Sequence, residues 1–136
     1  MSIQAQILNL LKDIQEQKGL TYMFITHDLS VVRHISDEIC VMYLGRVVEK
    51  CDAKELFRHP AHPYTSALLS ASPEPTLDKR KELQVIHGEV TSPVNPKRCC
   101  RFAARCPYAT ERCHEEEPLL TDIGGGHLCA CFQVQA

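Results

Sequence analysis

Four cysteines near the C-terminus constrain this chain more than any other feature. Gaps of five, six and seventeen residues separate Cys100, Cys106, Cys113 and Cys131. The longest gap contains Pro118 and a run of three glycines at 124–126, which allow the chain to reverse direction. Four thiolates that converge on one centre suit tetrahedral zinc or an iron–sulfur cluster.

The composition favours metal ligation over disulfide bonds. The chain has eight cysteines, and its N-terminus has no basic region ahead of an apolar one, so we expect no secretory signal and a reducing compartment. Clustered cysteines in such a compartment are more often metal ligands than disulfides. The net charge of −2, with acids and bases interspersed, argues against a nucleic-acid-binding surface. No apolar run approaches the ~20 residues that span a bilayer.

Three other cysteines receive different interpretations. We expect Cys99 and Cys129 to be bystanders, although Cys129 is an alternative fourth ligand because it lies two residues before Cys131. Cys40 lies in an apolar strand-like run and is predicted to be a small core residue.

The spacing of Cys106 and Cys113 bears on the size of the centre. The six residues between them can form about two helical turns, and seven residues advance a helix by roughly 10 Å. A regular helix through both would hold the sulfurs too far apart for one zinc ion. Either the helix starts after Cys106, or the centre is larger than a single ion.

The first part of the chain has the pattern of an α/β protein. Apolar residues at helical spacing predict a helix over 2–18, which Gly19 ends. Residues 20–26 form a short, nearly continuous apolar run that suits a strand buried in a parallel sheet. Such a strand needs neighbours, and most of that sheet is missing from this chain.

Further elements follow in order. We predict a short helix over 28–35, a hairpin of strands 39–44 and 46–49 around Gly45, and a helix opened by a capping box at Asp52. The two His-Pro pairs at 59–63 predict a rigid turn, and another helix follows over 64–71. Residues 72–78 are predicted to be a linker, and a short strand is predicted at 83–86.

His27 directly follows the predicted buried strand. Ligands bind at the carboxyl edge of parallel sheets, and a histidine there can donate a hydrogen bond to a phosphate. The alternative is a helix-capping or surface histidine.

Several motifs together resemble the ATP-binding subunits of oligopeptide and dipeptide ABC transporters. The segment 24–32, Phe-Ile-Thr-His-Asp-Leu-Ser-Val-Val, is similar to their H-loop, and 62–65, His-Pro-Tyr-Thr, resembles the start of their C-terminal extension. The segments 2–12, 41–49, 88–96 and the cysteine spacing complete a resemblance that covers essentially the whole chain.

The resemblance implies a fold and a division of the chain. Residues 1–51 would be the C-terminal part of an ABC nucleotide-binding domain, and 52–136 a small, loop-rich extension with the four-cysteine centre. The family's phosphate loop, signature motif and Walker B residues would precede Ser2, so we expect a fragment that is not an ATPase on its own.

The resemblance also implies sites, cofactors and partners. His27 would be the switch histidine that contacts the γ-phosphate of ATP, with Mg²⁺, in the full-length parent. The four cysteines would hold a [4Fe–4S] cluster, with zinc as the alternative. The partners would be a second ATP-binding subunit and transmembrane permease subunits on the cytoplasmic face of the membrane, with the peptide substrate reached through the transporter. A free-standing zinc-binding interaction module without an ATPase role is the alternative function.

Overall fold

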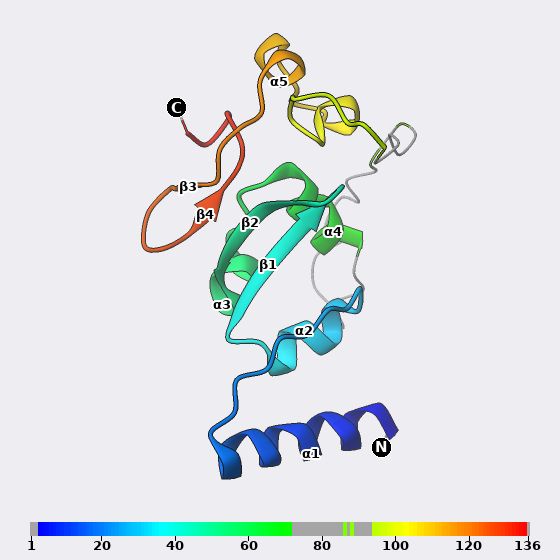
Figure 1. Ribbon diagram of the computed structural model, residues 1–136, viewed down its shortest axis with the longest axis vertical. Coiled ribbons are helices and arrows are strands. Elements are labelled where there is room, and N and C mark those ends of the chain that lie inside the picture. The colour runs from blue at the N-terminus through cyan, green and yellow to red at the C-terminus, as the bar shows by residue number, and fades with distance from the viewer. Residues whose placement is uncertain (1–2, 72–85, 87, 89–93, 136) are drawn as a thin grey trace, which may run out of the picture. The chain divides into compact units, whose positions relative to one another are not determined.

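The computed structural model describes residues 3–71, 86, 88 and 94–135, which combine helices with an antiparallel sheet (Figure 1). The chain divides into two compact units, residues 1–36 and residues 37–136. The predicted boundary between residues 51 and 52 rests on family resemblance and stays a prediction. None of the described helices is long and apolar enough to cross a membrane.

Two helices form the first unit, as predicted. Helix α1 (Ile3–Lys18) ends at Gly19, whose φ of +62° suits glycine. Helix α2 (Leu29–Ile35) begins after Asp28, whose carboxylate accepts hydrogen bonds from the backbone N–H groups of Ser30 and Val31.

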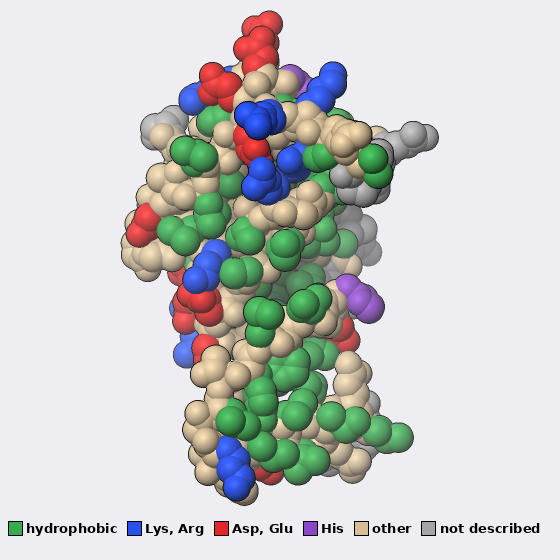
Figure 2. Space-filling view, viewed as in Figure 1, with side chains coloured by type: hydrophobic (Ala, Val, Ile, Leu, Met, Phe, Trp, Pro, Cys, Tyr) green, Lys and Arg blue, Asp and Glu red, His purple; other side chains and the backbone are tan. Residues whose placement is uncertain are grey.

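The predicted strand at residues 20–26 is wrong for this structure. The segment has no strand conformation, and the side chains of Met23 and Ile25 are 88% and 93% exposed. A parallel strand exists only when neighbouring strands satisfy its backbone hydrogen bonds, and no described strand pairs with this one. Figure 2 shows hydrophobic side chains gathered on the surface of this unit. Ile3, Ile7 and Leu10 of α1 are among its exposed hydrophobic residues.

The second unit is built on a four-stranded sheet in the order β1-β2-β4-β3. Strands β1 (Glu38–Tyr43) and β2 (Arg46–Asp52) form the predicted hairpin, and Gly45 supplies the turn with a φ of +77°. Strand β4 (Leu128–Cys129) pairs with β2 and with β3 (Thr121–Asp122), both antiparallel. The C-terminal segment therefore extends the hairpin sheet.

Short helices complete this unit. Helix α3 (Ala53–Arg58) packs against the hairpin and begins as predicted, because the Asp52 carboxylate accepts from the N–H groups of Lys54 and Glu55. Helix α4 (Pro63–Ala71) confirms the predicted helix after the His-Pro turn. The cysteine segment contains a 3₁₀ turn, η1 (Ala103–Arg105), and helix α5 (Glu111–Glu115). The predicted linker lies outside the described residues, as do all but Ile86 of the strand predicted at 83–86.

An aromatic cluster forms the centre of the second unit. Tyr43 and Val48 of the hairpin are buried in one cluster with Phe102, and Tyr64 of α4 packs against this cluster. Cys40 does not take part. Side chains alternate between the two faces of β1, so Ile39 is buried while Cys40 is exposed, which corrects the prediction of a core cysteine.

Candidate metal centre

The cysteine segment folds back on itself so that its first and third cysteines are neighbours. The N–H of Cys100 donates to the carbonyl of Cys113 at 3.0 Å. Cys106 ends η1, and α5 begins at Glu111, so no helix runs from Cys106 through Cys113. This is the first of the two arrangements that the spacing allowed.

The other three cysteines lie close enough to Cys100 to affect the pKa of its thiol. Burial raises the pKa of Cys100 to about 11, a hydrogen bond from the Phe102 backbone opposes this, and the neighbouring thiols at 113, 131 and 106 raise it further. Burial also raises the pKa of Cys106, and Cys131 and Cys113 add to that effect. Thiols that disfavour one another's charge in this way need a cation to become thiolates together.

Backbone N–H groups are directed at these sulfurs. Phe102 donates to Cys100 and Tyr108 donates to Cys106, each from two residues further along the chain. Gln133 and Val134 donate to Cys131, and the Thr110 hydroxyl lies 3.4 Å from the sulfur of Cys113. Hydrogen bonds to sulfur stabilise the thiolate and tune iron–sulfur and zinc sites. The donor set therefore fits a metal–thiolate centre.

Cys129 lacks this environment. It is fully buried and pairs with Glu49 across β2 and β4, and its pKa is raised by burial first and then by the Glu49 carboxylate. The backbone hydrogen bonds that lower the pKa values of Cys100, Cys106 and Cys131 have no counterpart among the influences on Cys129. A neutral thiol in the sheet core is the simpler interpretation of Cys129.

The aromatic cluster supports the cysteine segment. The ring of Phe102 lies 5.2 Å from that of Tyr43 and 5.4 Å from that of Tyr64, centroid to centroid. Cys100 and Cys106 pack against the same cluster. The His-Pro-Tyr-Thr motif thus contributes Tyr64 directly to the surface on which the cysteines sit.

The buried carboxylate of Glu49 connects β2 with the turn at residues 61–62 and with His127. Glu49 of β2 is fully buried, and it accepts from the N–H groups of Ala61 at 2.7 Å and His62 at 3.0 Å. Its Oε1 also lies 2.7 Å from Nε2 of His127, a buried residue just before β4. Sequence reasoning missed Glu49 and His127, and the only signal was a carboxylate at the end of an apolar strand.

We expect Glu49→Ala to destabilise the chain strongly. The substitution leaves two backbone N–H groups and the His127 ring without their acceptor, and breaking a buried pair typically costs about 3–5 kcal/mol. Urea unfolding measures this loss. The control is Glu38→Ala, which removes an exposed, solvent-screened ion pair with Lys50 and should have a much smaller effect on stability. Equal effects of the two substitutions would contradict the anchoring role of Glu49.

His62 makes stability depend on pH. Its side chain is buried, its Nδ1 accepts from the Tyr64 N–H, and burial lowers its pKa from 6.5 to about 4, against the opposing effect of Glu49. Below about pH 6.5 the unfolded chain therefore binds a proton on His62 that the folded chain does not bind. The full contribution of this residue to stability is present above pH 6.5, and it is lost as the pH falls toward 4.

The expected loss between about pH 7.5 and 4.5 is about 2–3 kcal/mol. Urea unfolding at both pH values should show a shallower dependence for His62→Gln than for the unmodified chain. His59→Gln is the matched control, because the side chain of His59 is 72% exposed in the same turn. The interpretation fails if all three proteins lose stability equally.

His27 lies in the first unit, exposed, directly before the Asp28 cap of α2. The Asp28 side chain, not His27, caps α2, which corrects the helix-capping alternative. The phosphate contact stays a prediction, with a surface histidine as its alternative.

Comparisons with known proteins identify the proteins to which this chain is similar. Residues 48–113 match the family described as "Oligopeptide/dipeptide transporter, C-terminal region". The chain is 50% identical over 134 residues to the dipeptide transport ATP-binding protein DppF of Haemophilus influenzae, covering 98% of this chain and 41% of that protein. It is 52% identical over 134 residues to DppF of Escherichia coli, covering 98% and 40%.

The sequence and both comparisons agree on one assignment. Part of this chain matches the C-terminal region of oligopeptide/dipeptide transporters, and nearly all of it is similar to part of dipeptide transport ATP-binding proteins. It spans about two fifths of the length of these relatives. The family match includes Cys100, Cys106 and Cys113 and ends before Cys131.

Proposed function

We propose that this chain is part of the ATP-binding subunit of a peptide-importing ABC transporter. The observation that carries the proposal is the alignment of 98% of the chain with dipeptide transport ATP-binding proteins. In the assembled transporter, the partners are a second ATP-binding subunit and the permease subunits, at the cytoplasmic face of the membrane. The peptide substrate is reached only through these partners.

Within this proposal, residues 1–51 complete a nucleotide-binding domain and supply His27. The imidazole would position the γ-phosphate of ATP and, with it, the attacking water. The phosphate loop and the residues that bind Mg²⁺ would lie in the rest of the subunit. The exposed apolar surface around α1 supports this role, because residues such as Ile7 and Leu10 are of the type that packs inside a larger domain.

Residues 52–136 form the extension, and Cys100, Cys106, Cys113 and Cys131 hold a [4Fe–4S] cluster. One observation supports this choice over a single zinc ion. Among the described residues, no three of these sulfurs lie within 4.8 Å of one another, whereas thiolates at about 2.3 Å from one tetrahedral zinc ion stand about 3.8 Å apart. The bound cluster would supply a crosslink between the cysteine segment and the C-terminal segment.

A chimera tests the transport role. The residues of H. influenzae DppF that align with this chain are replaced by the chain, and dipeptide uptake is measured in cells that lack the native subunit. We expect uptake to return when the chimera is produced. Assembly of the chimera with its partners at normal levels, without any uptake, would contradict the proposal.

A further inference from the structure

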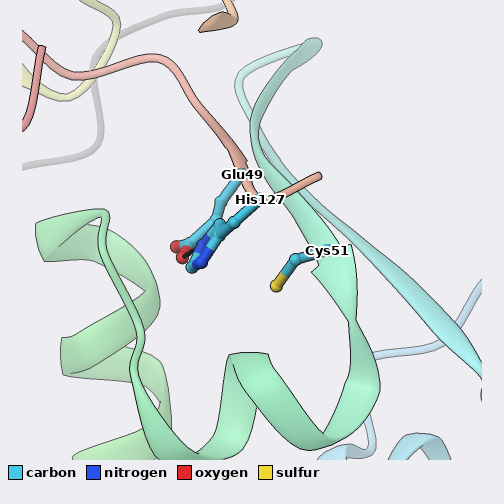
Figure 3. A group of neighbouring side chains, drawn as sticks. All are labelled: Glu49, Cys51 and His127. Atoms are coloured by element: carbon cyan, nitrogen blue, oxygen red, sulfur yellow. Dashed lines mark hydrogen bonds and ion pairs between the residues drawn. The ribbon is translucent and has the colours of Figure 1, made fainter. Parts of the chain in front are cut away.

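A second group of metal-binding side chains lies on the sheet, separate from the four cysteines. One ligand atom from each of Glu49, Cys51 and His127 lies within 4.8 Å of the other two, and all three residues are buried. Among the described residues, this is the only such group of three. Figure 3 shows the three side chains directed into one space between the sheet and the helices.

The sheet register explains why these residues meet. Glu49 and Cys51 are two residues apart on β2, so their side chains lie on the same face of the sheet. Lys50 pairs with Leu128 across β2 and β4, and one step further along this register sets His127 opposite Cys51. Two of the ligands therefore stand on β2, and the third directly precedes β4, the strand paired with it. Strands hold a site more firmly than loops do.

The carboxylate is already oriented. Oε1 of Glu49 accepts from the Ala61 N–H and Oε2 accepts from the His62 N–H, so the side chain cannot turn away from His127. Oε2 has a second lone pair available for a cation, and the second lone pair of Oε1 becomes available when a cation displaces the hydrogen between it and His127. Hydrogen bonds of this kind orient the ligands in metal sites.

An open pocket borders two of the three residues. A cavity of about 500 Å³ is lined by Cys51 and His127 together with Asp52, Glu55 and other residues of α3 and the 124–125 turn. The pocket gives a cation an entry path and leaves room for water as a fourth ligand. Three protein ligands plus water is the usual composition of an open zinc site.

We propose that Glu49, Cys51 and His127 bind one zinc ion at this place. One thiolate, one imidazole and one carboxylate match the borderline softness of zinc rather than Mg²⁺ or Ca²⁺. Two nitrogen or oxygen ligands at about 2.05 Å from tetrahedral zinc stand about 3.3 Å apart. Glu49 Oε1 and His127 Nε2 lie 2.7 Å apart, so the pair opens slightly as the thiol approaches.

Binding exchanges protons for the metal. The Cys51 thiol gives its proton to solvent. The hydrogen that lies between Nε2 of His127 and Glu49 moves by way of solvent to Nδ1, and zinc takes its place on Nε2 of the neutral imidazole. No bond is oxidised or reduced in this exchange.

Cobalt provides the probe, because a thiolate bound to Co²⁺ gives a charge-transfer band that reports sulfur ligation. The full chain, Cys51→Ala and Cys40→Ala are each titrated with Co²⁺ and then with zinc, and bound metal is counted. We expect Cys51→Ala to bind one metal fewer per chain, or to bind it at least about 100-fold more weakly. Cys40→Ala removes an exposed thiol from the same hairpin and should match the unmodified chain. The four-cysteine centre contributes equally to all three proteins, so the difference isolates the proposed site.

His127→Gln is the second variant, because glutamine can still donate a hydrogen bond to Glu49 while replacing the imidazole. We expect this variant to fold, with a melting temperature near that of the metal-free chain, and to lose the same metal ion as Cys51→Ala. Equal metal content and equal cobalt spectra in the unmodified chain, Cys51→Ala and His127→Gln would overturn the proposal. The group would then be a hydrogen-bonded pair beside a core thiol.

Discussion

Replacing any one of the four clustered cysteines with serine is expected to remove the iron from this protein. A serine hydroxyl is a poor substitute for a thiolate toward iron, and loss of one ligand exposes a cluster to solvent. The expected pattern is loss of iron in each of Cys100→Ser, Cys106→Ser, Cys113→Ser and Cys131→Ser. Iron analysis and visible absorbance of the purified variants measure it.

The same substitutions should have a large effect on folding. Structural zinc contributes about 10–16 kcal/mol of apparent binding free energy in small metal-dependent domains, and a cluster that crosslinks two segments acts in the same way. The segments 94–115 and 130–135 contain only η1 and α5 as regular structure. We therefore expect faster hydrogen exchange and proteolysis in these segments when the metal is lost.

Cys99→Ser and Cys129→Ala are the matched controls, because each removes a thiol next to the proposed ligands. Both should retain iron. Loss of iron in Cys129→Ala together with retention in Cys131→Ser would move the fourth ligand to Cys129. Retention of iron in Cys106→Ser or Cys113→Ser would exclude a four-thiolate centre.

The second large effect is expected at His27. In the chimera with H. influenzae DppF, His27→Ala should slow ATP hydrolysis by at least about 100-fold, as expected when a group that positions the γ-phosphate and water is removed. Nucleotide affinity should change only a few fold, because one imidazole contributes little to binding compared with a phosphate loop. Steady-state hydrolysis and nucleotide binding, measured separately, distinguish these effects.

His34→Ala is the control for His27→Ala. His34 is also an exposed histidine of the first unit, near the end of α2, and its loss should leave hydrolysis unchanged. Near-normal hydrolysis by His27→Ala would reduce His27 to a surface residue beside the helix cap.

Local signals in the sequence predicted most of the helices and the hairpin. The helical spacing before Gly19, the turn at Gly45 and the helix start at Asp52 each act over a few residues, and the structure confirms each one. Such signals are reliable because their physical cause lies within the same short segment.

Features that depend on distant partners were not predictable in the same way. The apolar run at 20–26 has strand composition, but a strand is a property of a pair, and the described residues offer it no partner. Cys40 was assigned to the core from the composition of its strand, although the alternation of side chains turns it outward. Glu49 and His127 are 78 residues apart, and only the pairing of β2 with β4 brings them together.

The content of the four-cysteine centre is tested most directly by analysing the full chain purified without oxygen. Iron, acid-labile sulfide and zinc are counted per chain, and Mössbauer spectroscopy reports the cluster type. We expect a brown protein with about four iron and four sulfide ions per chain, bound at Cys100, Cys106, Cys113 and Cys131. A colourless protein that holds zinc in that centre and binds no iron on anaerobic reconstitution would contradict it.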